Sequence, residues 1–264
     1  MLIKQQHVEH SKGGEKMVSH FSTIGLPLKS NEEFMEYAKL VCESGERLEV
    51  GEAAYLKLEL GEGVELWGQM NEANEIIGLN PHFKGTAVSK VCLTKKIENP
   101  AATDLDGQVC SEAEPGEDEE ITYPFVFDLP DIGLHELNFP SIKKVQLAAF
   151  AHELNIYTNE QTYKQAQEGE EGLNLATEFF IPSGLFSEEE APFLPDSTAI
   201  FGGRVLSTKK ITNPYTNEFF YYAKVKTLGR EIDVVADPEL VTEEMMEGNI
   251  ISGSFWLTGQ IHND

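Results

Sequence analysis

Two hydrophobic periods alternate along the first third of this chain and predict a strand, a helix and then a run of strands. A short strand is expected over residues 20–27. A helix is expected from Ser30, because this capping residue precedes two acids in the first turn and a single apolar stripe: Phe34, Tyr37, Ala38 and Val41. Alternation then predicts further strands over residues 53–60, 64–70 and 75–79.

The middle of the chain combines strand and helix patterns. Residues 85–97 and 123–129 alternate as strands. Over residues 141–155 apolar positions recur every three to four residues, which predicts an apolar helix, and a second helix is expected from Thr158. We therefore expect two helices in this region.

The last quarter of the chain has the most regular pattern. Asp237-Pro238 is expected to begin a loop or short helix, and four strands are expected over residues 200–211, 219–227, 230–236 and 250–261. Three bent strands, an insert and a further strand resemble the OB-fold barrel. That resemblance implies binding of oligonucleotides, oligosaccharides or protein partners, and it implies no catalysis.

A near-repeat links the middle of the chain with its end. Residues 94–100 read Thr-Lys-Lys-Ile-Glu-Asn-Pro, and six of these seven residues are identical at residues 208–214. A basic strand that ends at an Asn-Pro turn is thus used twice, which predicts two related β-modules or a duplicated ancestor. Because an acidic insert follows the first copy, the first barrel is expected to be incomplete.

Together these patterns predict an α+β protein with an N-terminal mixed α/β unit, a middle region and a C-terminal OB-like β-barrel. The expected limits are a flexible leader at 1–16, an α+β domain at 17–83, a middle region at 84–197 with the first repeat strand, an acidic insert and two helices, and the barrel at 198–264. Residues 13–16 can be encoded by a purine-rich stretch like a bacterial ribosome-binding site, so Met17 is expected to be the native start.

The charge of the chain is strongly negative, at a formal −25 from 45 acids and 20 Lys+Arg. Eleven acids and no Lys or Arg lie between Pro100 and Lys143, and eight more acids lie without a base between Lys164 and Arg204. Such a surface repels nucleic acid and keeps a protein soluble. Three cysteines without a Cys-x-x-Cys pair, no run of 18 apolar residues and no signal peptide predict a cytoplasmic bacterial protein without membrane association.

Candidate metal ligands are few. Asp104, Asp106 and Glu112 offer oxygen ligands near Gly107, but they lack the spacing of a helix-loop-helix calcium site. A solvated acidic segment is the simpler interpretation. We therefore predict no metal site and no cofactor.

The opening Ser19-His20-Phe21, followed by Gly25-Leu26-Pro27, a helix and several strands, resembles half of a vicinal-oxygen-chelate domain. That resemblance implies a first-strand histidine and a glutamate on a later strand as ligands of a divalent metal. Here only His20 matches the pattern, and no second module with a matching ligand is found. His152 also invites a catalytic interpretation, although a histidine on an apolar segment is more typical of a satisfied core or boundary residue.

The strand expected over residues 219–227 carries the candidate binding residues. Its odd positions are apolar and suit a barrel interior, whereas its even positions share the other face: Phe220, Tyr222, Lys224 and Lys226. Rings on which bases stack, for about 1–3 kcal/mol each, and cations for phosphates are what a single-strand nucleic-acid site requires, and Arg204 would add a cation. In the alternative, Glu231 and Asp233 pair with the lysines and another module covers the rings.

The favoured function is a non-catalytic binding or protein-interaction module, and the predicted partner is a protein or another module of the same chain. Two alternatives stay open. One is binding of single-stranded nucleic acid through the barrel, which the negative charge disfavours, and the other is a divalent-metal-dependent enzyme built around His20 or His152. Catalysis is the less favoured class, because the sequence has no phosphate loop, nucleophile elbow or His-Glu-x-x-His motif.

Overall fold

The computed structural model describes residues 19–98, 103, 105–113, 122–168, 174–183 and 195–262. The expected leader 1–16, the expected start at Met17 and the candidate ligand Asp104 lie outside the described residues. Thirteen strands and two α-helices make up most of the described chain, which confirms a β-rich α+β fold. None of the described helices is long and apolar enough to cross a membrane.

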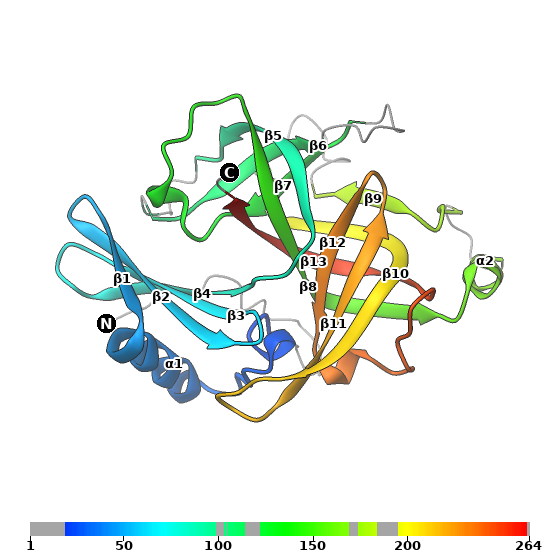
Figure 1. Cartoon of the computed structure of the whole chain (residues 1–264), viewed down its shortest axis with the longest axis horizontal. Helices are drawn as coiled ribbons and strands as arrows, with labels where there is room; N and C mark the ends of the chain where they lie inside the picture. Colours follow the sequence, from blue (N-terminus) through cyan, green and yellow to red (C-terminus); the bar gives the residue numbers. More distant parts are fainter. Residues whose placement is uncertain are drawn as a thin grey trace.

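The N-terminal unit is one helix on a four-stranded antiparallel sheet of order β1-β2-β3-β4. Its elements are η1 (Ser22–Ile24), α1 (Asn31–Ser44), β1 (Glu46–Val50), β2 (Ala53–Gly61), β3 (Val64–Met70) and β4 (Ile76–Phe83). The helix is confirmed with its capping box, because the Ser30 side chain accepts a hydrogen bond from the Glu33 amide and the Glu33 carboxylate accepts one from the Ser30 amide. Figure 1 shows α1 beneath this sheet.

The strand expected over residues 20–27 is wrong, since this segment forms the 3-10 turn η1. Local hydrogen bonds close the turn, from the Ser22 amide to the Ser19 carbonyl and from the Thr23 hydroxyl to the His20 carbonyl. Gly25 then ends it in the left-handed region, at φ 72°. Alternation over so few residues did not distinguish a strand from a buried turn.

All other strands belong to one nine-stranded sheet of order β11-β12-β8-β5-β6-β7-β13-β10-β9. Its elements are β5 (Val88–Lys96), β6 (Gln108–Ala113), β7 (Pro124–Asp128), η2 (Ile132–Leu134), β8 (Ser141–Tyr157), α2 (Glu160–Gln167), β9 (Phe179–Pro182), β10 (Thr198–Thr212), β11 (Phe219–Thr227), β12 (Arg230–Ala236), η3 (Pro238–Leu240) and β13 (Ile250–His262).

Additional pairings close this sheet into two rings of five strands. β10, β11, β12, β8 and β13 form one ring, in which only the β12–β8 pair is parallel. β5, β6, β7, β13 and β8 form the other, in which only the β7–β13 pair is parallel. The long strands β8 and β13 pair along most of their length and belong to both rings (Figure 1).

Both rings differ from the expected organisation. The C-terminal ring takes β8 from the region expected to be a separate middle part, so strand pairing crosses the expected boundary at 197/198. The ring that contains the first repeat copy is closed, so the expectation of an incomplete barrel was wrong. Each ring is therefore completed by a long strand, β8 or β13, that also belongs to the other ring.

The helix expected over residues 141–155 is also wrong, because this segment is the 17-residue strand β8. The seven residues from Val145 to Ala151 are buried on both faces of the sheet. A strand that is apolar on both faces has apolar residues at helical spacing as well, so periodicity did not separate the two structures. Of the two helices expected in the middle region, the described residues contain only α2.

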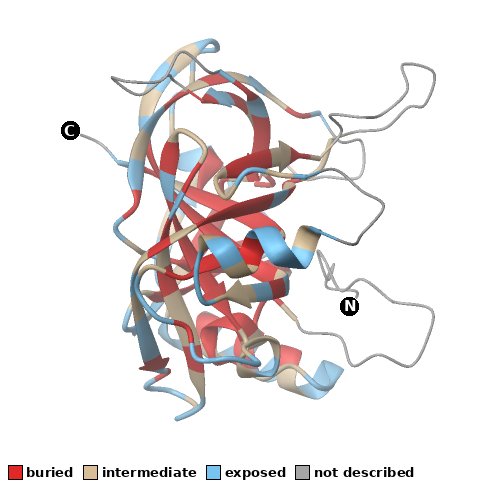
Figure 2. Ribbon diagram, turned by 90° about the vertical axis from the view of Figure 1, so that its right-hand side faces the viewer, coloured by how far each residue is buried: buried red, intermediate tan, exposed pale blue. Residues whose placement is uncertain are grey.

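The two largest of the four hydrophobic clusters among the described residues hold the rings and the N-terminal unit together, and buried residues run along the central strands (Figure 2). The first fills the rings with inward residues of their strands, such as Val91, Phe127, Leu147, Val225 and Leu257. The second lies between the outer face of the C-terminal ring and the N-terminal unit. It joins residues of α1 and the four-stranded sheet to Phe150, Phe220, Val235 and Trp256.

Where the structure describes both repeat copies, at residues 94–98 and 208–212, their strand environments match. Each lies at the end of a first ring strand, β5 or β10, near a break in register. The Thr94 hydroxyl donates a hydrogen bond to the Cys110 carbonyl of β6 at 3.1 Å, and the Thr208 hydroxyl donates one to the Tyr222 carbonyl of β11 at 3.0 Å. Ile97 and Ile211, three residues further on, are both buried.

Candidate functional site

The aromatic part of the even face of β11 is covered, which corrects its interpretation as an open stacking face. Phe220 is fully buried, and Tyr222 is half-buried. The Phe83 ring of β4 contacts both, with centroids 5.9 Å from Phe220 and 5.4 Å from Tyr222. Bases therefore cannot stack on Phe220, because the N-terminal unit occupies this face.

The three candidate cations each lie near a carboxylate. Lys224 lies 3.3 Å from Glu231 on β12, which matches one of the two expected cross-strand pairs. Lys226 lies 3.8 Å from Glu178, and Arg204 lies 3.6 Å from Glu160. Asp233, the other expected partner, is buried and instead accepts hydrogen bonds from the Tyr222 hydroxyl, the Gln146 side chain and the Ala87 amide.

The structure brings together the two histidines that the sequence singles out separately. The Nε2 atoms of His20 and His152 lie 2.6 Å apart, and the Trp256 ring stacks on His20 at 4.3 Å. At that distance one imidazole donates a hydrogen bond to the other. The described residues contain no group of three His, Cys, Asp or Glu side chains able to hold a metal ion, and a zinc centre needs at least three protein ligands.

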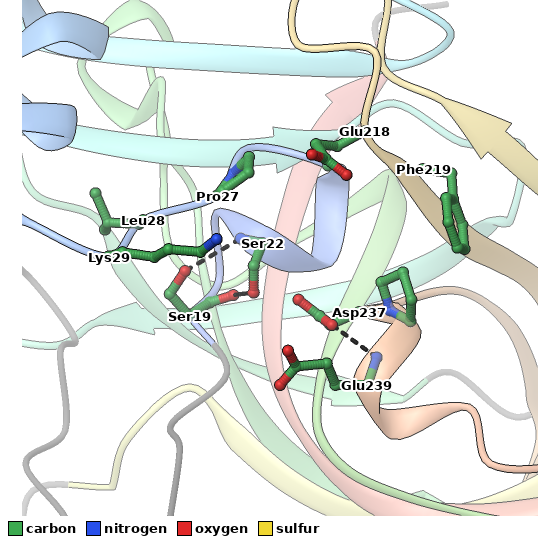
Figure 3. A pocket seen from close by; sticks show the side chains of 11 residues that line it. Ser19, Ser22, Pro27, Leu28, Lys29, Glu218, Phe219, Asp237 and Glu239 are labelled. Atoms are coloured by element: carbon green, nitrogen blue, oxygen red, sulfur yellow. Dashed lines mark hydrogen bonds between the residues drawn. The ribbon is translucent and has the colours of Figure 1, made fainter.

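A pocket of about 640 Å³ opens beside this region, where η1 meets β11 and η3. Figure 3 shows Lys29, Ser19 and Ser22 on one side of it and the carboxylates of Asp237 and Glu239 on the other. Its lining comes from three distant segments of the chain: Ser19, Ser22, Gly25, Pro27, Leu28 and Lys29, then Glu218 and Phe219, then Asp237, Pro238 and Glu239.

Hydrogen bonds between these segments fix the pocket walls. The Asn213 side chain donates to the Ile24 carbonyl at 2.9 Å, and the Thr216 hydroxyl donates to the Gly25 carbonyl at 2.6 Å. Both bonds join η1 to the loop that precedes β11. The conformation of Gly25 also matters there, because a Cβ at this residue would lie 2.9 Å from Asn213.

The opposite wall is shaped by a proline-containing turn. The Asp237 carboxylate accepts a hydrogen bond from the Glu239 amide at 2.8 Å and thereby caps η3, which has a proline in its first turn. Figure 3 shows the carboxylates of Asp237 and Glu239 on this side of the pocket.

The pocket is acidic and has one aromatic wall. Three carboxylates, of Glu218, Asp237 and Glu239, line it together with a single cation, Lys29. One face of the Phe219 ring is already in a cation–π contact with the Lys210 ammonium, which lies 3.4 Å from the ring centroid. The arrangement offers acceptors for cationic groups together with the apolar surface of Pro27, Leu28 and Pro238.

Sequence reasoning missed this pocket. The Asp237-Pro238 turn was recognised as a loop or short helix, but nothing distinguishes its acids from the other acids of the chain. Only the fold brings them next to Glu218 and to residues about 200 positions earlier.

Comparison of this chain with protein-family models, with curated proteins and with solved structures found no match.

Proposed function

We propose that this protein is a non-catalytic binding module that holds a positively charged polypeptide segment in the pocket between η1, β11 and η3. The observation that carries this proposal is the set of three carboxylates, Glu218, Asp237 and Glu239, around one pocket. Lysine or arginine side chains of a partner would donate hydrogen bonds to these carboxylates. Pro27, Leu28 and Phe219 would contact the aliphatic parts of the same side chains.

The strand order supports an OB-like description of the C-terminal ring. Its order, β10-β11-β12-β8-β13, corresponds to the OB-fold order one-two-three-five-four, with β8 as a fifth strand that precedes the others in the chain. OB-fold proteins bind ligands with strands two and three and with adjacent loops, including the loop between strands one and two. Here that loop leads into Glu218 and Phe219, at the pocket.

The second ring supports a duplicated origin. Its order, β5-β6-β7-β13-β8, is again one-two-three-five-four, this time with the strands numbered in chain order. Each half of the sheet would then supply four strands, and the fourth strand of one half would act as the fifth strand of the other. The matching hydrogen bonds of Thr94 and Thr208 favour this interpretation of the near-repeat.

Charge determines which ligand class we propose. A net charge of −25 repels polyanions and attracts polycations over several ångströms of solution. Three carboxylates against one ammonium in the pocket act in the same direction. A basic polypeptide therefore fits the pocket better than an oligonucleotide does.

Isothermal titration with hexalysine amide tests this proposal. We expect saturable binding at low salt that weakens in Glu218→Gln, because the variant removes one carboxylate of the pocket and keeps its size. The loss expected for one charged hydrogen bond is about 1.5–3 kcal/mol. Glu72→Gln, an exposed acid in the turn between β3 and β4, is the matched control and should bind like the unmodified protein.

Two results would contradict the proposal. Equal weakening in Glu218→Gln and Glu72→Gln would indicate attraction to the general acidic surface rather than to the pocket. Saturable binding of oligothymidylate under the same conditions, without binding of hexalysine, would favour the nucleic-acid alternative.

A further inference from the structure

Arg230, the first residue of β12, is a buried cation inside the barrel. Inward residues of β12 are otherwise apolar, as Ile232 and Val234 are, yet the Arg230 side chain points the same way and the residue is only 6% exposed. Its Nε and Nη1 groups have no hydrogen-bond partner among the described residues. No carboxylate in the described part of the chain forms an ion pair with it.

Such a group destabilises a folded protein unless something else compensates it. A guanidinium that leaves water loses strong hydration, and its donors regain that free energy only by bonding to an acceptor. Buried donors without partners are rare in proteins, so each one needs a physical explanation.

Aromatic rings provide part of the compensation. The Arg230 guanidinium carbon lies 4.5 Å from the Phe125 centroid and 5.3 Å from the Tyr123 centroid, which is within the range of cation–π attraction. Phe180 extends this wall, stacked on Tyr123 at 4.9 Å. The Tyr123 hydroxyl donates to the Leu228 carbonyl at 2.8 Å, and its oxygen helps to stabilise the charged form of Arg230.

The ring faces attract the positive charge of Arg230. The N–H bonds of the guanidinium lie in its own plane, and the rings do not accept hydrogen bonds from them. Nη1 lies on the Cδ side of that plane and the Nε–H bond points to the other side, so the two unpaired groups face different directions and each can donate a charge-assisted hydrogen bond to its own acceptor. An anion beside either group would be held by a charge-assisted hydrogen bond, with the aromatic rings around it.

We propose that Arg230 is the anchor of an anion-binding site at the Tyr123, Phe125 and Phe180 end of the C-terminal barrel, and that the ligand carries a carboxylate or a phosphate group. The site is distinct from the acidic pocket, which involves other residues and the opposite charge. The net charge of −25 makes such binding selective, because anions find little nonspecific attraction on this protein.

Thermal unfolding of the full chain in the presence of small anions tests the site. We expect 10 mM inorganic phosphate to raise the unfolding midpoint by about 3 °C over sodium chloride of equal ionic strength. Arg230→Met should not respond, and without added anion it should unfold at the same or a higher temperature, because it removes an unpaired buried cation and keeps the apolar stem. Arg47→Met, at an exposed ion pair with Glu49, should respond like the unmodified protein.

A second arm with sodium acetate distinguishes the ligand classes. A response to acetate and to phosphate indicates a site for carboxylates as well, and a response to phosphate alone indicates a phosphate site. Both results support the proposal.

Two outcomes would overturn it: no response of the unmodified protein to either anion, or an equal response in Arg230→Met. If Arg230→Met does not fold, Arg230→Lys replaces it, with phosphate binding followed by the phosphorus resonance linewidth. The lysine variant should bind at least about tenfold more weakly, because an ammonium neither stacks on the aromatic rings nor places its donors as the planar guanidinium does. Unchanged binding in that variant would equally contradict an anchoring role.

Discussion

At the scale of single residues, Asp233 ties the segment that leads into β5 to the C-terminal barrel. Its buried carboxylate accepts three hydrogen bonds, from the Ala87 amide at 2.7 Å, the Gln146 side chain at 2.9 Å and the Tyr222 hydroxyl at 2.8 Å. Burial raises the pKa of the Tyr222 phenol, as does the nearby Asp233 charge, so the hydroxyl keeps its proton and donates it. Gly85 is needed beside this carboxylate because a Cβ there would overlap it.

Tyr222→Phe should therefore destabilise the protein by about 1–2 kcal/mol, because Asp233 stays buried with one donor fewer. The measurement is the free energy of unfolding in urea. Tyr221→Phe is the matched control, since the Tyr221 hydroxyl forms no hydrogen bond with a described residue, and it should change stability little. Equal losses in the two variants would show that the Tyr222 hydroxyl has no special role.

Because His82 is buried, we expect the free energy of unfolding to depend on pH. Its imidazole is fully buried between β4 and β13, where Nδ1 lies 3.2 Å from the Thr258 hydroxyl. Burial lowers the pKa of His82, and the nearby carboxylates of Glu65 and Asp131 offset this only in part. In the unfolded chain the histidine pKa is the ordinary value of about 6.5. The unfolded chain therefore binds a proton at this residue more strongly than the folded protein does.

Stability should consequently fall as the pH is lowered from about 6.5 toward the depressed pKa of folded His82, with a slope of up to about 1.4 kcal/mol per pH unit from this residue. Urea unfolding of the unmodified protein and of His82→Gln between pH 5 and 7.5 measures the difference. The variant should be less stable at pH 7.5 but should have the smaller slope. Parallel pH profiles of the two proteins would contradict this assignment.

At the scale of elements, local signals predicted well and long-range pairing did not. The helix α1 was predictable because its cap and its apolar stripe lie within one short segment. Strand β8 was mistaken for a helix because both of its faces are buried, so its sequence lacks the alternation of apolar and polar residues that marks a half-exposed strand. The neighbouring strands that bury it are not visible in the sequence of this segment. The turn η1 was missed for a related reason, since its conformation depends on contacts to the loop before β11.

The candidate site was predictable to an even smaller extent. The even face of β11 was correctly recognised as a face of rings and cations, and its covering by another module was the alternative that the structure supports. The acidic pocket was not predictable, because its three segments meet only in the folded chain. Arg230 was part of an expected strand, but its burial without a partner is visible only in three dimensions.

The equivalent threonines of the repeat give a prediction for strands β5 and β10. Thr94→Val and Thr208→Val each remove a hydroxyl that bonds to the neighbouring strand, and each keeps the shape of the side chain. Both should cost about 0.5–1.5 kcal/mol, and the two losses should agree to within about 0.5 kcal/mol. Thr212→Val, at an exposed position of β10, is the control. A large loss at one threonine and none at the other would contradict equivalent roles.

At the scale of the whole molecule, the two rings share strands and the N-terminal unit packs against one of them. The shared strands β8 and β13 make the two rings one structural body, so neither is complete without residues of the other. The N-terminal unit covers one face of the C-terminal ring and at the same time contributes η1 to the pocket. The rings on β11 that could have stacked with bases are therefore covered, and the pocket that forms nearby is acidic and suits cations.

Amide chemical shifts of the ¹⁵N-labelled protein, recorded during titration with hexalysine amide, test the proposed pocket most directly. We predict that the largest shifts occur at the amides of residues 25–26, 28–29, 218–219, 237 and 239, and that they saturate together. Shifts distributed over the acidic surface without saturation, or concentrated away from these three segments, would contradict the account.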